Sequence, residues 1–237
     1  MKLLVLCSLL LYLFALPVRH SFAMMRNAVV TGANRGLGLE ICRQLLLESK
    51  NWDNVYALCR KTSPELDALT TTTSDGTKVS VIEGIDMVQG GFETVFSQRL
   101  TQEDGTATPI SLLIHNAGGY GPPEDFSDPD DVYRSQSLEN ITPERLVYAF
   151  HLNSAAPLFL TKQLLPNLRA NNNKANNDTT TKVIIISSLM GSIHDNTSGG
   201  HYGYRGKCAR LVLLDHVFWI ATLVIFPSHT VSNIIFA

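Results

Sequence analysis

Five short segments rich in Val, Ile, Leu and Ala alternate with segments of helical character, and this alternation constrains the fold more than any other feature. Continuous apolar runs of this length, flanked by helices, are typical of strands that are buried on both faces of a parallel sheet. The sequence therefore predicts an α/β protein with a doubly wound parallel sheet. The expected strands are 27–31, 55–59, 78–84, 111–115 and 183–187.

Three short helices are expected between the first four strands. In the first of them, Leu39, Ile41 and Leu45 recur at the spacing that places side chains on one face of a helix. The predicted ranges of these helices are 37–48, 64–69 and 92–100.

A longer helix is predicted over 143–169, between the fourth and fifth strands, with Thr142 as a suitable N-cap. Pro157 lies inside this helix and predicts a kink, because proline has no backbone N–H to donate. The flanking segments 118–139 and 171–181 are rich in Gly, Pro, Asp or Asn, and we expect them to be loops.

A glycine-rich turn, TGANRGLG (31–38), joins the first strand to the first helix. Its glycines allow a tight turn and a close approach of the backbone to a ligand, and the start of the helix presents unpaired N–H groups to a diphosphate. This succession of strand, glycine turn and helix indicates a dinucleotide-binding site of the Rossmann kind. The cofactor-binding residues expected in the turn are Thr31, Gly32, Asn34, Arg35, Gly36, Leu37 and Gly38.

The turn also resembles that of the short-chain dehydrogenase/reductase family, TGxxxGxG, and the resemblance continues in order over roughly residues 27–206. HNAG (115–118) is similar to the family's NNAG at the end of the fourth strand, with His115 in place of the first Asn. In the family this segment lines the adenosine side of the cofactor and stabilises the sheet, and an acid after the third strand binds the adenine amino group. The residues to which the resemblance gives these roles are Asn116, Ala117, Gly118 and Asp86.

Within the family, segment 187–205 is most similar to the sniffer and C-factor branch of carbonyl reductases. The resemblance implies that Ser188 binds the carbonyl oxygen of the substrate and that Tyr204 donates the proton. It also implies that Asn153 orders a water molecule for proton relay, and that a lysine one helical turn after the tyrosine lowers the pKa of the phenol. Lys207 is the candidate, but it stands three residues after Tyr204 where the family has four, which turns its ammonium group to the other flank.

Charge at the end of the second strand indicates which cofactor is bound. This strand ends in Cys59 and Arg60, with no acidic residue where an NAD enzyme would bind the ribose hydroxyl. Arg60 and Arg35 are both expected to face a 2′-phosphate, which a guanidinium group binds well. The expected cofactor is therefore NADP(H).

The first 23 residues are similar to a secretory signal peptide, because Lys2 precedes an apolar run that small residues follow. The alternative is an upstream extension with initiation at Met24 or Met25, in which case family resemblance implies a cytoplasmic protein. Three N-x-S/T sequons would be glycosylation sites only in a secreted chain. They are Asn140, Asn177 and Asn196.

After Arg205 the family pattern is no longer recognisable, and segment 207–237 is strongly apolar. We therefore expect a dinucleotide-binding domain over 24–206 whose sheet lacks its last strands, followed by a tail that adds no strand. Residues 206–208 (GKC) can be encoded with the splice-donor consensus GTAAGT, so one hypothesis for the tail is a retained intron. The other is that VFWIATLVIF (217–226) associates with a membrane, although it is too short to span one.

Composition and resemblance together favour an enzyme that acts on a small molecule. The net charge of −2 supplies no field for nucleic acid, and the cysteines and histidines, His115 and His151 included, show no metal-ligand spacing. The histidines are expected on the surface or in cavity walls. The resemblance implies an NADPH-dependent oxidoreductase that reduces the carbonyl group of an aldehyde, ketone or quinone, and a homodimer formed through the long helices near Asn153 and Tyr204. The alternatives are a truncated chain that catalyses nothing and a nucleotide-binding regulatory protein.

Overall fold

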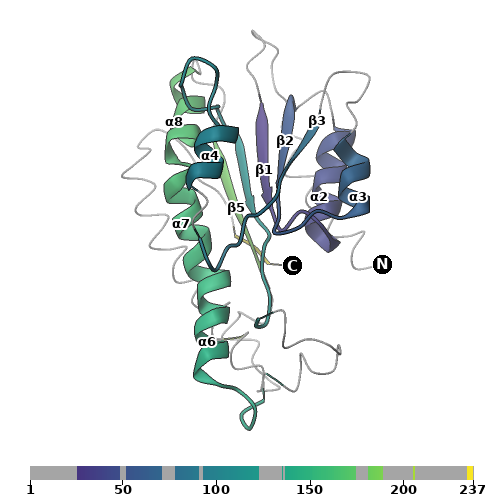
Figure 1. The fold of residues 1–237 in the computed structure, drawn as a ribbon, viewed down its shortest axis with the longest axis vertical. Coiled ribbons are helices and arrows are strands. Elements are labelled where there is room, and N and C mark those ends of the chain that lie inside the picture. The colour runs from purple at the N-terminus through teal and green to yellow at the C-terminus, as the bar shows by residue number, and fades with distance from the viewer. Residues whose placement is uncertain are drawn as a thin grey trace.

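A parallel sheet with the strand order β3-β2-β1-β4-β5-β6 forms the centre of the molecule (Figure 1). The strands are β1 (Asn27–Thr31), β2 (Asn54–Leu58), β3 (Lys78–Ile82), β4 (Leu112–His115), β5 (Lys182–Ser187) and β6 (Ile234–Phe236). The computed structural model describes residues 26–48, 52–70, 78–90, 93–122, 135, 137–174, 181–188, 205 and 234–236. Because the strand order reverses between β1 and β4, the predicted doubly wound sheet is confirmed.

Helices cover both faces of this sheet. Figure 1 shows α2 and α3 on one face, and α4 together with α6, α7 and α8 on the other. Their bounds are α2 (Gly36–Leu47), α3 (Pro64–Asp67) followed by a 3₁₀ turn (Ala68–Thr70), α4 (Glu93–Arg99), α6 (Pro143–Phe150), α7 (Ala156–Gln163) and α8 (Leu165–Lys174). The three short helices predicted from the sequence are thus confirmed, with shifts of one residue at their ends.

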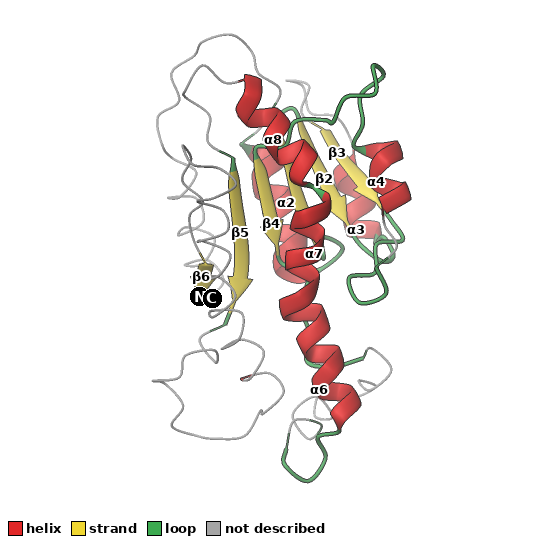
Figure 2. Cartoon of the chain, turned by 90° about the vertical axis from the view of Figure 1, so that its left-hand side faces the viewer, coloured by secondary structure: helices red, strands yellow, loops and turns green. Residues whose placement is uncertain are grey.

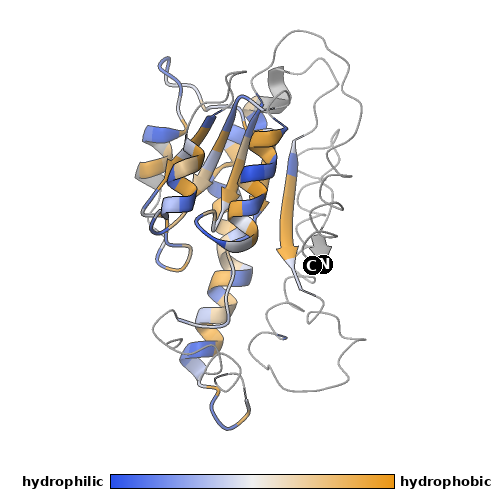
Figure 3. Cartoon of the chain, turned by 90° about the vertical axis from the view of Figure 1, so that its right-hand side faces the viewer, coloured by the Kyte–Doolittle hydropathy of each residue, from blue (hydrophilic) through white to orange (hydrophobic). Residues whose placement is uncertain are grey.

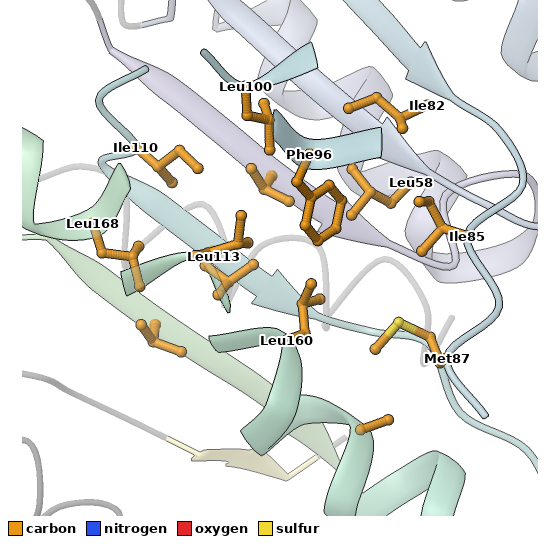
Figure 4. Packing of buried hydrophobic residues seen from close by; sticks show 14 residues of the cluster. Leu58, Ile82, Ile85, Met87, Phe96, Leu100, Ile110, Leu113, Leu160 and Leu168 are labelled. Atoms are coloured by element: carbon orange, nitrogen blue, oxygen red, sulfur yellow. The ribbon is translucent and has the colours of Figure 1, made fainter. Parts of the chain in front are cut away.

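Each face of the sheet has its own apolar core, because successive side chains of a strand point to opposite faces. On β4, Leu113 packs with Phe96 and Leu160 beneath α4 and α7, as Figure 4 shows. Its neighbours Leu112 and Ile114 belong to the core beneath α2. The strand β5 is hydrophobic along most of its length (Figure 3). Burial of one such leucine stabilises the fold by about 1.5–3 kcal/mol, so these cores hold the strand ends firmly in place.

The long helix differs from its prediction in two ways. Thr142 caps its first turn as expected, but His151–Ala155 form a π-helical turn just before Pro157. The predicted kink therefore takes the form of one wide turn, in the segment where the missing N–H of Pro157 removes an α-helical hydrogen bond. The predicted helix is also interrupted at Leu164, just after the end of α7, and α8 then runs to Lys174, so the prediction of a loop from residue 171 was wrong for its first four residues. Adding residues to an existing helix is far easier than nucleating one, and Asn residues are tolerated there.

The end of the chain adds a sixth strand, which the sequence did not predict. β6 pairs with β5 in parallel, with Ile234 opposite Ile185 and Phe236 opposite Ser187 (Figure 2). The expectation that the tail 207–237 adds no strand was therefore wrong. The outer edge of β5 offers unpaired N–H and C=O groups, and a β-branched apolar segment is well suited to pair with them.

Several sequence predictions concern residues outside the described ranges. These are segment 1–23, Tyr204, Lys207, the sequons Asn177 and Asn196, and segment 217–226. The third sequon, Asn140, is exposed in the turn before α6. None of the helices in the described part of the chain is long and apolar enough to cross a bilayer.

Candidate functional site

A cleft of about 820 Å³ lies at the carboxyl ends of β1 and β4, where the strand order reverses. Ligands of open α/β sheets bind at this position. The glycine turn, the ends of the strands and the helix pair α6–α7 form its walls. The predicted cofactor residues that line the cleft are Thr31, Gly32, Asn34, Arg35, Gly36, Arg60, Asp86, Asn116, Ala117 and Gly118.

The three glycines of the turn are required for three different reasons. Gly32 has a φ of +64°, and a Cβ atom there would lie 2.9 Å from the Cα of Ala117. Gly36 has a φ of +56°, but a Cβ atom there would meet nothing within 4 Å. A Cβ atom on Gly38 would lie 2.2 Å from the carbonyl oxygen of Gly32. Gly32 and Gly38 therefore serve close packing, whereas Gly36 leaves open space on the cleft side of the turn, where a ligand can approach the backbone.

The start of α2 faces the cleft with unsatisfied backbone donors. Arg35 is the N-cap in an extended conformation, and its side chain makes no capping hydrogen bond. The first turn also contains no acidic residue. The N–H groups of the first turn have no partner within the helix, and the helix dipole places partial positive charge at the same point. This arrangement suits a diphosphate.

Thr31 and Asn116 join the glycine turn to the end of β4. The Thr31 hydroxyl oxygen accepts hydrogen bonds from the backbone N–H groups of Asn116 (3.0 Å) and Ala117 (2.9 Å). The Asn116 side-chain amide donates to the carbonyl oxygens of Thr31 (3.0 Å) and Gly32 (3.2 Å). Because both strand ends are held by four hydrogen bonds, the shape of the turn does not depend on a ligand.

Polar residues from β2 and β3 form the far end of the cleft. Asp86 accepts hydrogen bonds from the N–H groups of Val88 (2.8 Å) and Gln89 (3.1 Å) through Oδ1, so Oδ2 is not used in this turn. Arg35 and Arg60 are both exposed and both line the cleft. The cationic groups at this end therefore come from two separate loops.

Asn153 connects the helix pair to the loop after β4. Its amide nitrogen donates to the carbonyl oxygens of Gly119 (3.0 Å) and Ala149 (2.7 Å), and its Oδ1 accepts from the N–H of Gly119 (3.0 Å). A Cβ atom on Gly118 would lie 2.8 Å from this Oδ1, so the loop approaches the helix as closely as glycine allows. The side chain of Asn153 thus makes three hydrogen bonds to backbone groups, which hold it between the helix and the loop.

The π-helical turn changes the backbone hydrogen bonding beside Asn153. In a regular α-helix the carbonyls of Leu152 and Asn153 would accept from residues 156 and 157. Here the N–H of Ala156 donates to His151 instead, and Pro157 has no N–H. Neither carbonyl therefore receives its α-helical hydrogen bond.

The end of β5 places two serines at the site. Ser187 ends the strand, is buried and lines the cleft. Ser188 follows it, is half-buried and is not among the cleft-lining residues. The structure therefore brings Ser187 to the cleft wall, whereas the sequence resemblance assigned the catalytic role to Ser188. Tyr204 and Lys207, the other predicted catalytic residues, lie outside the described ranges.

His115 is a buried polar residue of the cleft wall, and the sequence gave no sign of its hydrogen bonding. Its side chain is 2% exposed, and its Nε2 lies 2.8 Å from the hydroxyl oxygen of Thr161 on α7. Burial lowers the pKa of His115 to about 3, so the ring is neutral at physiological pH. A thiol, Cys59, also lines the cleft, and burial raises its pKa to about 11, so it is protonated.

These features together define a dinucleotide-binding α/β fold, with the site at the topological switch point of the sheet. Residues 26–203 match the family described as short chain dehydrogenase. The chain belongs to this family of oxidoreductases.

Known proteins similar to the chain include reductases. The very-long-chain 3-oxoacyl-CoA reductase of Schizosaccharomyces pombe is 28% identical over 177 residues, which are 73% of this chain and 47% of that protein. The chain spans about half the length of the curated relatives it matches first. The solved structure of the carbonyl reductase Sniffer of D. melanogaster has a TM-score of 0.70 at 23% identity, covering 90% of this chain and 80% of that one. The NADPH-bound carbonyl reductase from chicken fatty liver has a TM-score of 0.63 at 26% identity, with 84% and 75% covered.

Proposed function

We propose that this protein is an NADPH-dependent oxidoreductase that reduces the carbonyl group of a small aldehyde, ketone or quinone. The observation that carries the proposal is the glycine turn, which leaves the donors at the start of α2 open to a cleft at the switch point of the sheet. The similar proteins add support, since all three are reductases and the chicken enzyme was solved with NADPH.

The preference for NADPH rests on charge at the β2 end of the cleft. Arg35 and Arg60 line it from two loops, and no acid follows β2 to bind a free ribose hydroxyl. Two guanidinium groups suit a 2′-phosphate, because each can donate two parallel hydrogen bonds to its oxygens. Asp86 would then use Oδ2 to accept from the adenine amino group.

The catalytic end is assigned by family resemblance and by the helix geometry. The bound nicotinamide would supply the hydride. Ser188 would donate a hydrogen bond to the carbonyl oxygen, and Tyr204 would donate the proton, with Lys207 lowering the pKa of the phenol from about 10. The carbonyls of Leu152 and Asn153, which lack their α-helical hydrogen bonds, would offer acceptors for the relay water.

The proposal is tested by NADPH binding and turnover in the full chain. We expect NADPH fluorescence to rise on binding, and an aromatic aldehyde or an ortho-quinone to oxidise the cofactor. Gly36→Asp should abolish binding, because it places a carboxylate beside the diphosphate. Gly105→Asp is the matched control, since Gly105 also has a positive φ (+79°) and open surroundings but lies away from the cleft.

Equal NADPH affinity in the parent and the Gly36→Asp variant would refute the proposed cofactor site. Binding without turnover would instead favour a nucleotide-binding regulatory protein. The observation that supports this second function is the spacing of Lys207, which stands one position short of the lysine position of the family.

A further inference from the structure

Two buried polar side chains of the cleft wall lie on the same face of the sheet. Leu113 on β4 and Val183 on β5 both belong to the core beneath α7, and side chains alternate along a strand. His115 and Ser187 therefore face the same side as these two residues. The strand register pairs His115 with Ile185, which places Ser187 two residues further along the neighbouring strand. Both side chains line the cleft.

The hydrogen bonds of Thr161 determine the tautomer of His115. The Thr161 hydroxyl donates its one proton to the carbonyl oxygen of Pro157, at 2.8 Å. Its oxygen can therefore only accept from the His115 Nε2, also at 2.8 Å, so Nε2 carries the ring proton. In a neutral ring Nδ1 is then an acceptor with a lone pair.

Within the described part of the chain, neither of these two atoms has a hydrogen-bond partner. His115 Nδ1 and Ser187 Oγ are both buried and both unpaired. Buried polar atoms are normally paired, because removing them from water without a partner costs free energy. Two such atoms on adjacent strands and in one cleft wall point to a group that binds there.

We propose that His115 Nδ1 and Ser187 Oγ form a binding site for one neutral hydrogen-bond donor, either a water molecule or a hydroxyl group of a bound ligand. Such a group donates to Nδ1 and accepts from the serine hydroxyl, which satisfies both atoms. A carboxylate, or the diphosphate bridge of a dinucleotide, does not fit this site, because neither carries a proton near neutral pH that it could give to Nδ1. A cation is disfavoured by the apolar neighbours that line the same cleft, among them Leu152, Pro157 and Ile185.

This site makes the two ends of the cleft chemically different, whichever cofactor binds there. The start of α2 suits the diphosphate, whereas an acceptor at His115 Nδ1 suits a neutral donor, so the two sites together favour the orientation that places the diphosphate of a dinucleotide at α2. An asparagine, which the family pattern has here, offers both a donor and an acceptor, whereas His115 offers only an acceptor towards the cleft. The replacement therefore narrows the groups that this wall can bind.

The test is nuclear magnetic resonance of the full chain with ¹⁵N-labelled histidine, without ligand. The His115 signals are assigned by their loss in His115→Asn, which restores the family residue, with folding checked by circular dichroism. We expect Nε2 to be protonated. We also expect the chemical shift of Nδ1 to be displaced from that of an unprotonated imidazole nitrogen without a hydrogen bond, in the direction that accepting a hydrogen bond produces. Ser187→Ala should reduce this displacement, and Ser137→Ala, a matched change outside the cleft, should leave it unchanged.

A protonated Nδ1, a bare Nδ1 resonance, or a displacement that Ser187→Ala does not reduce would each overturn the proposal. Addition of NADPH separates the two sources of the donor. A further change of the Nδ1 resonance supports the site and identifies a ligand hydroxyl, whereas an unchanged displacement supports it and identifies water. Failure to bind NADPH would count against the proposed function alone, because the measurement without ligand tests the site.

Discussion

Replacing Gly38 with alanine would place a methyl group 2.2 Å from the carbonyl oxygen of Gly32 and 2.4 Å from the amide nitrogen of Asn116. Neither neighbour can move freely, because the Asn116 amide makes two hydrogen bonds to the turn, at 3.0 and 3.2 Å. Loss of these bonds costs about 1 kcal/mol each. Overpacking against fixed backbone adds about 1–3 kcal/mol. We therefore expect Gly38→Ala to lower the free energy of unfolding by about 3–5 kcal/mol.

Urea unfolding and thermal unfolding, both followed by circular dichroism, measure this loss. For a domain of this size, about 3–5 kcal/mol corresponds to a fall in Tm of roughly 6–20 °C. NADPH titration of the folded fraction should show no binding, since the turn can no longer hold the start of α2 against β4.

Two control variants separate steric overlap from backbone strain. Gly36→Ala and Gly105→Ala both introduce Cβ at a positive φ into open space, so each should cost about 1–2 kcal/mol. Only Gly36→Ala should also weaken NADPH binding, because only Gly36 lines the cleft. If Gly38→Ala is as stable as the parent, or if Gly36→Ala is the more damaging of the two, the packing argument for Gly38 fails.

Three further predictions concern the two ends of the cleft. Arg60→Asp should weaken NADPH binding roughly tenfold to a hundredfold and NADH binding far less. The control variant Arg169→Asp, on α8, should change the affinity for neither cofactor. Equal losses for both cofactors in Arg60→Asp would disprove the 2′-phosphate assignment. Asn153→Leu removes the three hydrogen bonds that hold Gly119 and Ala149 to this side chain, so it should lower kcat more than it raises the Kd for NADPH. Steady-state kinetics and NADPH titration measure the two effects, and the reverse ranking would place this residue in cofactor binding. Burial lowers the pKa of His115 to about 3, whereas a histidine in the unfolded chain has a pKa of about 6.5. As the pH falls below about 6.5, the unfolded state therefore takes up a proton that the folded state does not. The free energy of unfolding should then decrease by about 1.4 kcal/mol per pH unit, which amounts to about 2 kcal/mol by pH 5. In His115→Asn this part of the slope should disappear from urea unfolding curves, and an identical slope in both proteins would show that the ring is protonated in the fold.

Most residues that line the candidate cleft could be predicted from the sequence, because their signals are local. The glycine turn is contiguous, and its shape depends on backbone conformation within 31–38. The buried strands are also local signals, since apolar runs between helices are compatible with few other arrangements. For this reason the predicted strands were confirmed to within two residues at their ends.

The proposed catalytic end of the cleft was harder to predict from the sequence, because it depends on contacts between distant segments. Asn153 was selected by resemblance, but only the structure shows that its side chain makes three hydrogen bonds to Gly119 and Ala149 and that a π-helical turn surrounds it. Pro157 predicted an irregularity in the helix, but not that it would be a π-helical turn. The pairing of β6 with β5 likewise joins residues about fifty positions apart, and no local pattern marks that partnership.

The sequence by itself determined a parallel sheet and a glycine turn at the start of a helix. The sheet follows from the pattern of apolar residues, and the turn follows from glycine backbone freedom within a few consecutive positions. Only the tertiary structure decided which polar atoms are satisfied. The state of His115 depends on Thr161, 46 residues away, and on the proton that Thr161 gives to Pro157. A hydrogen-bond chain of this kind exists only after helix and sheet have packed together, so no inspection of neighbouring residues could reveal it.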